Sequence, residues 1–483
     1  MRKWTRRDFF RHTAAYGGAV IIAPPLEGLA RWSKGAPAGA VRGPGYGELV
    51  RSEDCPELRI PTGFRCVKLS ATQQPSRVDP SFTVPAAVDG MAAFALPNGN
   101  IRLIRNHEVT DPAARARPFG TRPYDAKCGG GTTSLEIEVG GQADALEVRL
   151  VREFVSLSGT QTNCAGGPTP WGSWLSCEET TEGVPLVRLW SGTFGGRERE
   201  HGYVFEVPVV AEAEIEPVPL KAMGRFVHEA VAVDPRTGIV YETEDAYYDP
   251  MRAAERPGAG FYRFIPEERD ELREGGRLQM LAVEGRPRYD TSRGQTPRVA
   301  LPARWVDIED PDPADAGERR DAVLQQGLAA GGAIFSRLEG CWYGNGAVYF
   351  NATSGGDLRA GQVWQYRPTA DDAGELTLVF ESPGREVLNS PDNICTSPRG
   401  GLVICEDPGR FPFIRGLSPE GEIFDLVQQP ESAEGPPPTE FAGSCFSPDG
   451  RILFFNIQGT TRTGGPQPGG TYALWGDWER GPL

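Results

Sequence analysis

Acidic and amide residues recur at matching points of six similar stretches of the sequence. The stretches open on polar residues, which are Asp89, Asn163-Cys164, His228-Glu229, Glu339 and Asp392-Asn393. They close on further acids and amides, which are Asn106-His107-Glu108, Glu178-Glu179, Glu244-Asp245, Asn351, Glu406-Asp407 and Asn456. Carboxylate and amide oxygens suit Ca²⁺ or another hard cation, whereas the Cys164 thiol beside carboxylates favours a transition metal such as iron. We therefore expect a site for several cations wherever these residues converge.

Other catalytic chemistries find little support in the sequence. The four histidines are His12, His107, His201 and His228, so a binuclear site built mostly from imidazoles is excluded. A serine triad has only His107 and His228 as candidate bases in the repeated stretches. The chain has no GxSxG turn, no Walker loop and no GxGxxG after a β-rich run. A hydrolase built on this sequence would need metal-activated chemistry.

The six stretches share one plan that predicts how their polar ends are positioned. They span residues 89–108, 163–179, 228–245, 339–354, 392–407 and 442–458. Each holds two β-rich runs around a turn such as Pro97-Asn98-Gly99 or Pro448-Asp449-Gly450, which indicates a hairpin. A further β-rich run follows each hairpin, and another precedes the next one, so each unit should have four strands.

Six such units in series predict an all-β protein, a six-bladed β-propeller. The sixth unit lacks its last strand, and residues 64–70 supply a candidate for it ahead of the first hairpin. Pairing of the two ends would close the ring and remove exposed sheet edges. A pair of β-sandwiches with coincidental spacing is the alternative. In a propeller the inner strands line one axis, where crowded acids repel each other unless cations neutralise them.

Three segments lie outside the repeats. Residues 1–32 carry Arg6-Arg7 before a short apolar stretch, which predicts a twin-arginine (Tat) export signal and the start of a linker. An ordinary N-terminal helix is the alternative. The linker should continue over 33–62, and the propeller should cover 63–483. The longest interruption, 286–336, falls between the third and fourth units, and its 314–328 part looks helical and is expected to cap one face.

The charge, hydropathy and cysteine spacing of the sequence exclude several classes of binding partner and site. The formal net charge of −15 argues against nucleic acid as a partner, and no segment is long and apolar enough to span a membrane. The nine cysteines form no CxxC pair, so neither a zinc ribbon nor a thioredoxin-type site is indicated. We interpret five of them as core residues, namely Cys177, Cys341, Cys395, Cys405 and Cys445.

Several motifs resemble those of the PhoX alkaline phosphatases. The matching pieces are RLIRNHE (102–108), GTQTNCAGGPTPWGSWLSCEE (159–179), GRFVHEA (224–230), YETED (241–245), RLEG (337–340), SPDNI (390–394) and CEDP (405–408). The resemblance covers about Asp89 to Gln458, and 159–179 is its most specific part. It implies a six-bladed propeller exported by the Tat machinery to the periplasm or the medium. It also implies a cluster of Fe³⁺ and Ca²⁺ with a bridging oxo group, which hydrolyses phosphate monoesters, and in some cases diesters, to release phosphate.

The resemblance also implies roles for particular residues. It makes Cys164 an iron ligand, and it adds the metal ligands Glu178, Glu179, Glu229 and Glu339, followed by the less direct matches Asp392, Glu406 and Asp407. It gives Arg337 the task of holding the substrate phosphate, since a guanidinium suits two phosphoryl oxygens. Asn106 is a second candidate for a phosphate contact.

The expected reaction is metal-assisted, in-line transfer of a phosphoryl group in a monomeric enzyme that acts on small phosphate esters. The metals and Arg337 would share the charge on the phosphoryl oxygens, and no side-chain nucleophile is required. Two alternatives stay open at this point. A calcium-dependent propeller lactonase would need one Ca²⁺ and no cysteine ligand, and a secreted binding module would hold only structural Ca²⁺.

Overall fold

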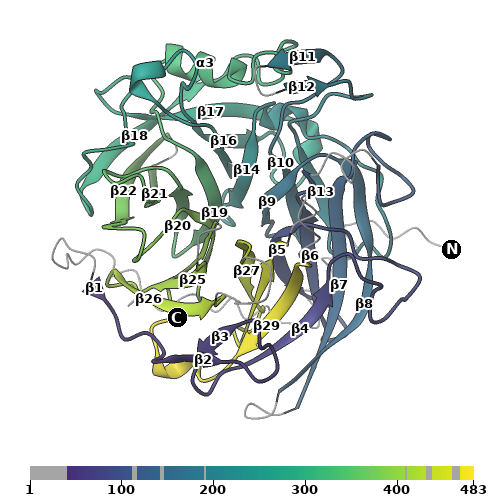
Figure 1. The fold of residues 1–483 in the computed structure, drawn as a ribbon. Helices are drawn as coiled ribbons and strands as arrows, with labels where there is room; N and C mark the ends of the chain where they lie inside the picture. The colour runs from purple at the N-terminus through teal and green to yellow at the C-terminus, as the bar shows by residue number, and fades with distance from the viewer. Residues whose placement is uncertain are drawn as a thin grey trace.

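The computed structural model of the chain describes residues 41–110, 117–141, 146–189, 192–370, 372–407, 411–430, 438–459 and 468–483. Within these residues nearly all regular structure is antiparallel β-sheet, and the sheets stand around a central axis (Figure 1). Six innermost strands contact one another in a closed cycle, in the order β5, β9, β14, β19, β23, β27 and back to β5. The predicted all-β propeller is therefore confirmed.

Each inner strand begins a blade, meaning a group of strands paired outward from the axis. The first blade is β5 (Val88–Ala95), β6 (Ile101–His107), β7 (Gly130–Gly140) and β8 (Glu147–Thr160). The second is β9 (Asn163–Pro168), β10 (Ser173–Glu178) and β13 (Val204–Pro208), beside the separate hairpin β11 (Leu186–Leu189) and β12 (Gly192–Gly195). The third is β14 (His228–Val233), β15 (Val240–Glu244), β16 (Phe261–Pro266) and β17 (Gly276–Val283).

The other blades follow the same plan. The next is β19 (Leu338–Gly344), β20 (Ala347–Ala352), β21 (Gln362–Ala370) and β22 (Ala373–Glu381). It is followed by β23 (Pro391–Thr396), β24 (Leu402–Glu406), β25 (Phe413–Leu417) and β26 (Glu422–Gln428). The last is β27 (Phe441–Phe446), β28 (Ile452–Ile457), β29 (Gly470–Trp475) and β4 (Arg65–Ala71).

Three features shape and close this ring. The turn glycines of the inner hairpins, such as Gly99 and Gly450, have φ of 88° and 73°, a left-handed backbone that glycine adopts without strain. Hydrophobic clusters join neighbouring blades; one contains Leu69 of β4, Leu103 of β6 and Phe454 of β28. β4 pairs with β29 over Arg65–Ala71, as predicted for the strand that closes the last blade.

The segments outside the repeats differ from expectation. Residues 41–62, expected as a linker, form β1 (Val41–Arg42), β2 (Leu49–Arg51) and β3 (Arg59–Pro61), and both β1 and β3 pair with β26 at the outer edge of a blade. Within 286–336, the helix α3 is shorter than predicted, Ala322–Ala329, and it packs at the rim against β17 instead of over a face (Figure 1). The same insertion contains an unpredicted strand, β18 (Ala300–Asp307), which pairs with both β17 and β22.

The predicted export signal, residues 1–32, lies outside the described residues. Among the residues that the structure does describe, no helix combines the length and apolar character needed to cross a membrane.

Candidate metal centre

Each inner strand carries a β-bulge near its start. In β5 the pairing shifts between Val88 and Met91, so that two residues, Asp89 and Gly90, oppose one residue of β6. Four other inner hairpins shift at the corresponding point, and in β27 the shift falls one residue later, between Ala442 and Cys445. The first bulge residues are Asp89, Cys164, Glu229, Glu339, Asp392 and Gly443. Because a bulge re-aims the side chain it carries, the repeat sends a ligand-type side chain toward the axis from five of the six strands.

Small residues follow at the second bulge position because the strands approach closely there. They are Gly90, Ala165, Ala230, Gly340, Asn393 and Ser444. A Cβ atom on Gly90 would lie 2.5 Å from the Cα of Ala165, and one on Gly340 would lie 2.6 Å from the Asp392 carbonyl oxygen. A cavity of only about 10 Å³ remains at this level of the axis, room for about one water molecule.

A second ring of side chains stands nearer to solvent. Its members directly follow the second strand of each inner hairpin, and they are Glu108, Glu179, Asp245, Thr353, Asp407 and Gln458. The backbone N–H of each donates to a carbonyl just ahead of the same blade's bulge, for example from Glu179 to Thr162 and from Asp407 to Ser390. The four acids of this ring are half-buried, whereas the four acids of the bulge ring are buried.

Glu178 and Glu406, the acids directly before Glu179 and Asp407, face away from the axis, because successive residues of a strand point to opposite faces. Glu178 accepts hydrogen bonds from the backbone N–H groups of Gln161, Gly202 and Tyr203. Glu406 accepts from Arg415 Nε at 2.8 Å. The structure thus brings neither Glu178 nor Glu406 to the axis with the other predicted ligands. It does bring Cys164, Glu179, Glu229, Glu339, Asp392 and Asp407 there.

Arg337 lies two residues before the Glu339 bulge, at the edge of these acids. Its Nε and Nη2 contact the two carboxylate oxygens of Asp245 at 3.0 and 3.1 Å, and Nη2 lies 2.6 Å from Glu339 Oε1. Its Nη1 has a longer contact, 4.0 Å to Asp407 Oδ2. The residue has a left-handed φ of 51°, a conformation that costs an ordinary side chain about 1–3 kcal/mol and that clusters at functional sites. Arg337 is therefore held at the axis with one nitrogen only loosely engaged.

Asn106 does not reach the acids, contrary to the expectation of a phosphate contact. Its amide donates to the carbonyl oxygens of Cys164 and Ala165 at 3.1 and 2.7 Å and accepts from Trp174 and Ser176, which uses all its hydrogen-bonding capacity. Three other inner hairpins use a side chain in the same way to hold the bulge carbonyl of the next blade, namely Thr243 to Glu339, Asn351 to Asp392 and Asn456 to Asp89. Asn106 belongs to this bracing set.

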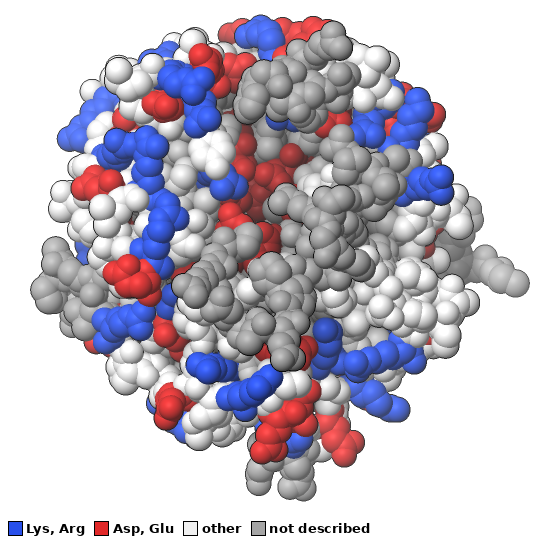
Figure 2. Space-filling model, in the orientation of Figure 1, with Lys and Arg blue, Asp and Glu red and all other residues white. Residues whose placement is uncertain are grey.

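Three overlapping groups of the axial side chains could each hold a metal ion. They are Asp89, Glu108 and Cys164; Cys164, Glu179 and Glu229; and Glu229, Glu339 and Asp392. The ligand atoms within each group all lie within 4.8 Å of one another, and Cys164 Sγ is 3.0 Å from Glu229 Oε1. Figure 2 shows acidic side chains gathered in the central hollow of this face.

The crowded acids of these groups repel one another and need added positive charge to offset that repulsion. Among the described residues, Arg337 is the cation that forms ion pairs with them. Burial, reinforced by neighbouring carboxylates, raises the pKa of Asp392 to about 7 and that of Glu108 to about 8. Burial and the same carboxylates raise the pKa of the Cys164 thiol well above its usual range. The buried oxygens Asp89 Oδ1 and Glu229 Oε2 have no hydrogen-bond partner. A set of cations fits these residues, because it would replace the protons and satisfy the unpaired oxygens.

Four further acids belong to the centre. Asp89, Glu108 and Asp245 stand at predicted hairpin ends, but the motif resemblance does not single them out as ligands. Glu440 is new; Asp392, Asp89, Asp407 and Glu108 help raise its pKa after burial, which places it among them. It precedes the one inner strand whose bulge residue is a glycine, Gly443, and no sequence motif marks it. We call these four acids, the six predicted ligands that lie at the axis and Arg337 the axial centre.

The comparisons with known proteins agree with this architecture. A family model described as "Alkaline phosphatase PhoX" matches residues 44–460. The structure of Pseudomonas fluorescens PhoX in complex with vanadate, a transition state analogue, is similar at 18% identity with a TM-score of 0.62, covering 91% of this chain and 98% of that one. A gluconolactonase from Xanthomonas campestris has 14% identity and a TM-score of 0.40, covering 90% of this chain and 99% of that one.

No curated protein matches the chain. The Pseudomonas fluorescens structure supports the propeller fold, and the family model covers far more than half of the sequence, including every residue of the axial centre. The chain belongs to the PhoX alkaline phosphatase family.

Proposed function

We propose that the protein is a metal-dependent phosphatase that hydrolyses phosphate esters, mainly monoesters, at the axial centre and releases inorganic phosphate. The observation that carries the proposal is the convergence of buried acids and a thiol on one arginine, at the solvent-facing end of the axis, in a member of this family.

The metals that we infer are Fe³⁺ and Ca²⁺. A thiolate ligand favours a transition metal, so Cys164 with Glu179 and Glu229 would hold iron. The all-carboxylate group of Glu229, Glu339 and Asp392 offers only hard oxygen ligands, which suit calcium. When bound, such cations neutralise phosphoryl oxygens and activate water for attack on phosphorus.

The chain's own part is to position the phosphoryl group. Asp245 holds the Arg337 guanidinium from one side through two contacts, which leaves Nη1 directed toward the half-buried acids. From there Nη1 donates a hydrogen bond to a phosphoryl oxygen and shares the charge that develops on it. The buried bulge ring behind it keeps bulk water out of the far side of the centre.

The test combines activity with metal content. Protein purified with iron and calcium bound should hydrolyse p-nitrophenyl phosphate, and Glu339→Ala should lose both this activity and bound metal. Active protein free of both metals contradicts the proposal. The lactonase alternative needs no thiol ligand, so the Cys164 contact with Glu229 favours the phosphatase. Cys164→Ser should accordingly lose iron and phosphatase activity together.

We also propose that the protein acts as a monomer outside the cytoplasm, exported by the Tat machinery. The support is the Arg6-Arg7 pair ahead of a weakly apolar stretch. Replacement of both arginines by lysine should keep the protein in the cytoplasmic fraction, and appearance in the periplasm regardless would contradict this route.

A further inference from the structure

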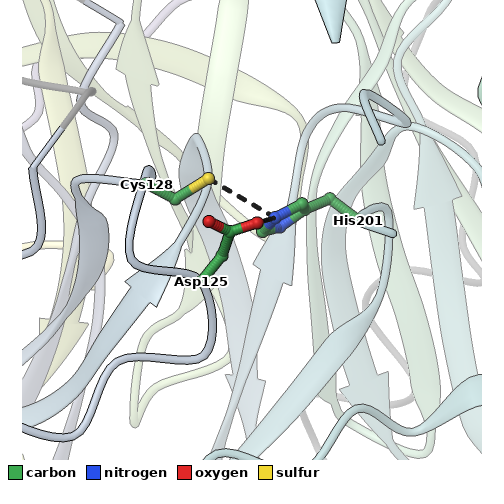
Figure 3. Close-up of side chains that lie close together, drawn as sticks. All are labelled: Asp125, Cys128 and His201. Atoms are coloured by element: carbon green, nitrogen blue, oxygen red, sulfur yellow. Dashed lines mark hydrogen bonds and ion pairs between the residues drawn. The ribbon is translucent and has the colours of Figure 1, made fainter. Parts of the chain in front are cut away.

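A second group of ligand-type side chains lies away from the axial centre, beside the second blade. Asp125 and Cys128 come from the connection between β6 and β7, and His201 comes from the segment just before β13. The three side chains point at one another (Figure 3). All three are fully buried, and none is a member of the axial groups. We call these residues, with Gln161 and Glu178 beside them, the lateral cluster.

The distances in the lateral cluster match those between ligands of one small metal ion. His201 Nε2 lies 3.4 Å from Cys128 Sγ and 3.4 Å from Asp125 Oδ2. Bonds of about 2.0–2.3 Å in a tetrahedral zinc site place neighbouring ligand atoms about 3.3–3.8 Å apart. A ligand atom from each of the three residues lies within 4.8 Å of the other two, close enough for one ion to contact all three.

The surroundings orient these side chains as a metal site requires. Glu178 Oε1 lies 2.6 Å from His201 Nδ1, so the carboxylate fixes the ring and leaves Nε2 to face Cys128 and Asp125. A carboxylate on the far nitrogen of a metal-binding histidine is the usual supporting contact. The Asp125 carboxylate is fixed in turn by the backbone N–H groups of Lys127, Glu198 and Arg199.

The Gln161 side chain gives an independent indication that the lateral cluster lacks a binding partner. Its side chain is 1% exposed, and its amide faces the cluster with Oε1 3.4 Å from Cys128 Sγ. Its Nε2 has no hydrogen-bond partner. A buried, unpaired amide costs free energy unless another group satisfies it. Once Cys128 is a thiolate it can no longer donate to Gln161 Oε1, and this amide oxygen would then be available as a fourth ligand.

We propose that the lateral cluster binds one Zn²⁺ through Cys128 Sγ, His201 Nε2 and Asp125 Oδ2, with Gln161 completing the site. The mixed sulfur, nitrogen and oxygen donors suit zinc and not calcium, and full burial is typical of a structural ion. Binding displaces the Cys128 thiol proton and the proton that His201 Nε2 directs at Asp125, and it leaves the neutral imidazole with its proton on Nδ1, toward Glu178. The ion fastens the β6–β7 connection to the second blade, next to the turn that carries Glu179. The proposal does not depend on the activity proposed above.

Cobalt substitution tests the proposal with a readout other than activity. Since Cys164 could also bind cobalt, the experiment uses Cys164→Ser protein, from which metals are removed and to which Co²⁺ is added. We expect one thiolate-to-cobalt charge-transfer band per chain, which disappears when Cys128→Ser is added. Cys445→Ser, a buried cysteine of the last blade, is the matched control and should keep the band.

The test still decides the proposal if one of the variants fails to fold. Folded Cys164→Ser protein that takes up cobalt without this band overturns the proposal, and so does a band that persists after Cys128→Ser. On the unaltered protein, metal analysis should find one zinc per chain that survives mild chelation, and zinc-edge X-ray absorption of Cys164→Ser protein should report one sulfur ligand. Protein that contains no zinc, and in which a metal-free His201 is hydrogen-bonded between Glu178 and Asp125, also overturns the proposal.

Discussion

The axial centre and the lateral cluster meet at one peptide bond, between Glu178 and Glu179. The two sites differ in the hydrogen bonding and the solvent exposure of their side chains. Glu179 stands half-buried among acids with unpaired oxygens, whereas Glu178 is fully buried and its carboxylate is satisfied by three backbone N–H groups and His201. The axial centre is rich in oxygen and open to solvent, so it can exchange cations and admit a substrate. The lateral cluster is closed and has mixed donors, so it can hold an ion but admits no substrate. Hardness of the ligands and access to solvent separate a reactive site from a structural one.

The neighbouring glutamates give the largest contrast. Glu179→Gln should lower kcat/KM for p-nitrophenyl phosphate by at least about 100-fold, because the loss of an outer partner of a metal site alone typically costs about 10–100-fold. Glu178→Gln should leave the metals of the axial centre bound. It should lower the free energy of unfolding by about 3 kcal/mol, since it breaks a buried charged pair. Kinetics, metal analysis and denaturant unfolding measure these effects. Equal loss of axial metal in the two variants would contradict the different roles given to Glu178 and Glu179.

Arg337 should affect turnover without affecting the lateral cluster. Arg337→Ala should lower kcat/KM by about 10²–10³-fold and weaken inhibition by phosphate, because a charge-stabilising donor is lost, while Arg337→Lys should restore part of the loss. Arg415→Lys is the control, since Arg415 is another arginine paired with a glutamate, Glu406, but lies away from the axis. If Arg415→Lys impaired phosphate inhibition as strongly as Arg337→Ala did, Arg337 would have no special role in phosphate binding.

Metal removal should make stability depend on pH through the axial centre. The folded pKa values of Asp392 (about 7) and Glu108 (about 8) lie above ordinary carboxyl values. The native state therefore binds more protons than the unfolded state between about pH 4 and pH 8, and stability falls as the pH rises through that window. Melting temperatures of the metal-free protein should drop from pH 5 to pH 8, and added calcium should flatten the drop. An identical slope with and without calcium would mean that cations do not replace these protons.

The bracing side chains should have the smallest effect. Asn106→Ala should lower the free energy of unfolding by about 1–3 kcal/mol, because it leaves the partners of the buried amide unpaired. KM for small phosphate esters should change little, since Asn106 does not reach the acids. A large rise in KM with unchanged metal content would restore Asn106 as a phosphate contact.

The sequence was sufficient to predict the fold and most of the axial centre because both repeat. Six copies of one hairpin plan fix the propeller, and residues at equivalent points of the repeats converge on its axis. The choice between Glu178 and Glu179, or between Glu406 and Asp407, depends on which face of the strand each residue occupies beside the bulge. Alternation along the strand could have shown that only one member of each pair faces inward.

The remaining features depend on tertiary packing that no local pattern reveals. The strand β18 was missed because it pairs with two different blades across an irregular insertion. Asp125, Cys128 and His201 come from two connections without a metal-binding motif, and only the fold brings them together. Glu440 occupies the repeat position that Arg337 holds in its own blade, since each accepts a backbone hydrogen bond from the ring member after the second strand, but no motif marks Glu440 as a ligand. These residues follow from the three-dimensional arrangement and not from spacing.

Anomalous diffraction from crystals of the active enzyme tests the central claim most directly. Data collected at the iron edge and at long wavelength should show iron beside Cys164, Glu179 and Glu229, and calcium among Glu229, Glu339 and Asp392. Active crystals with no anomalous peak among these side chains would contradict the account.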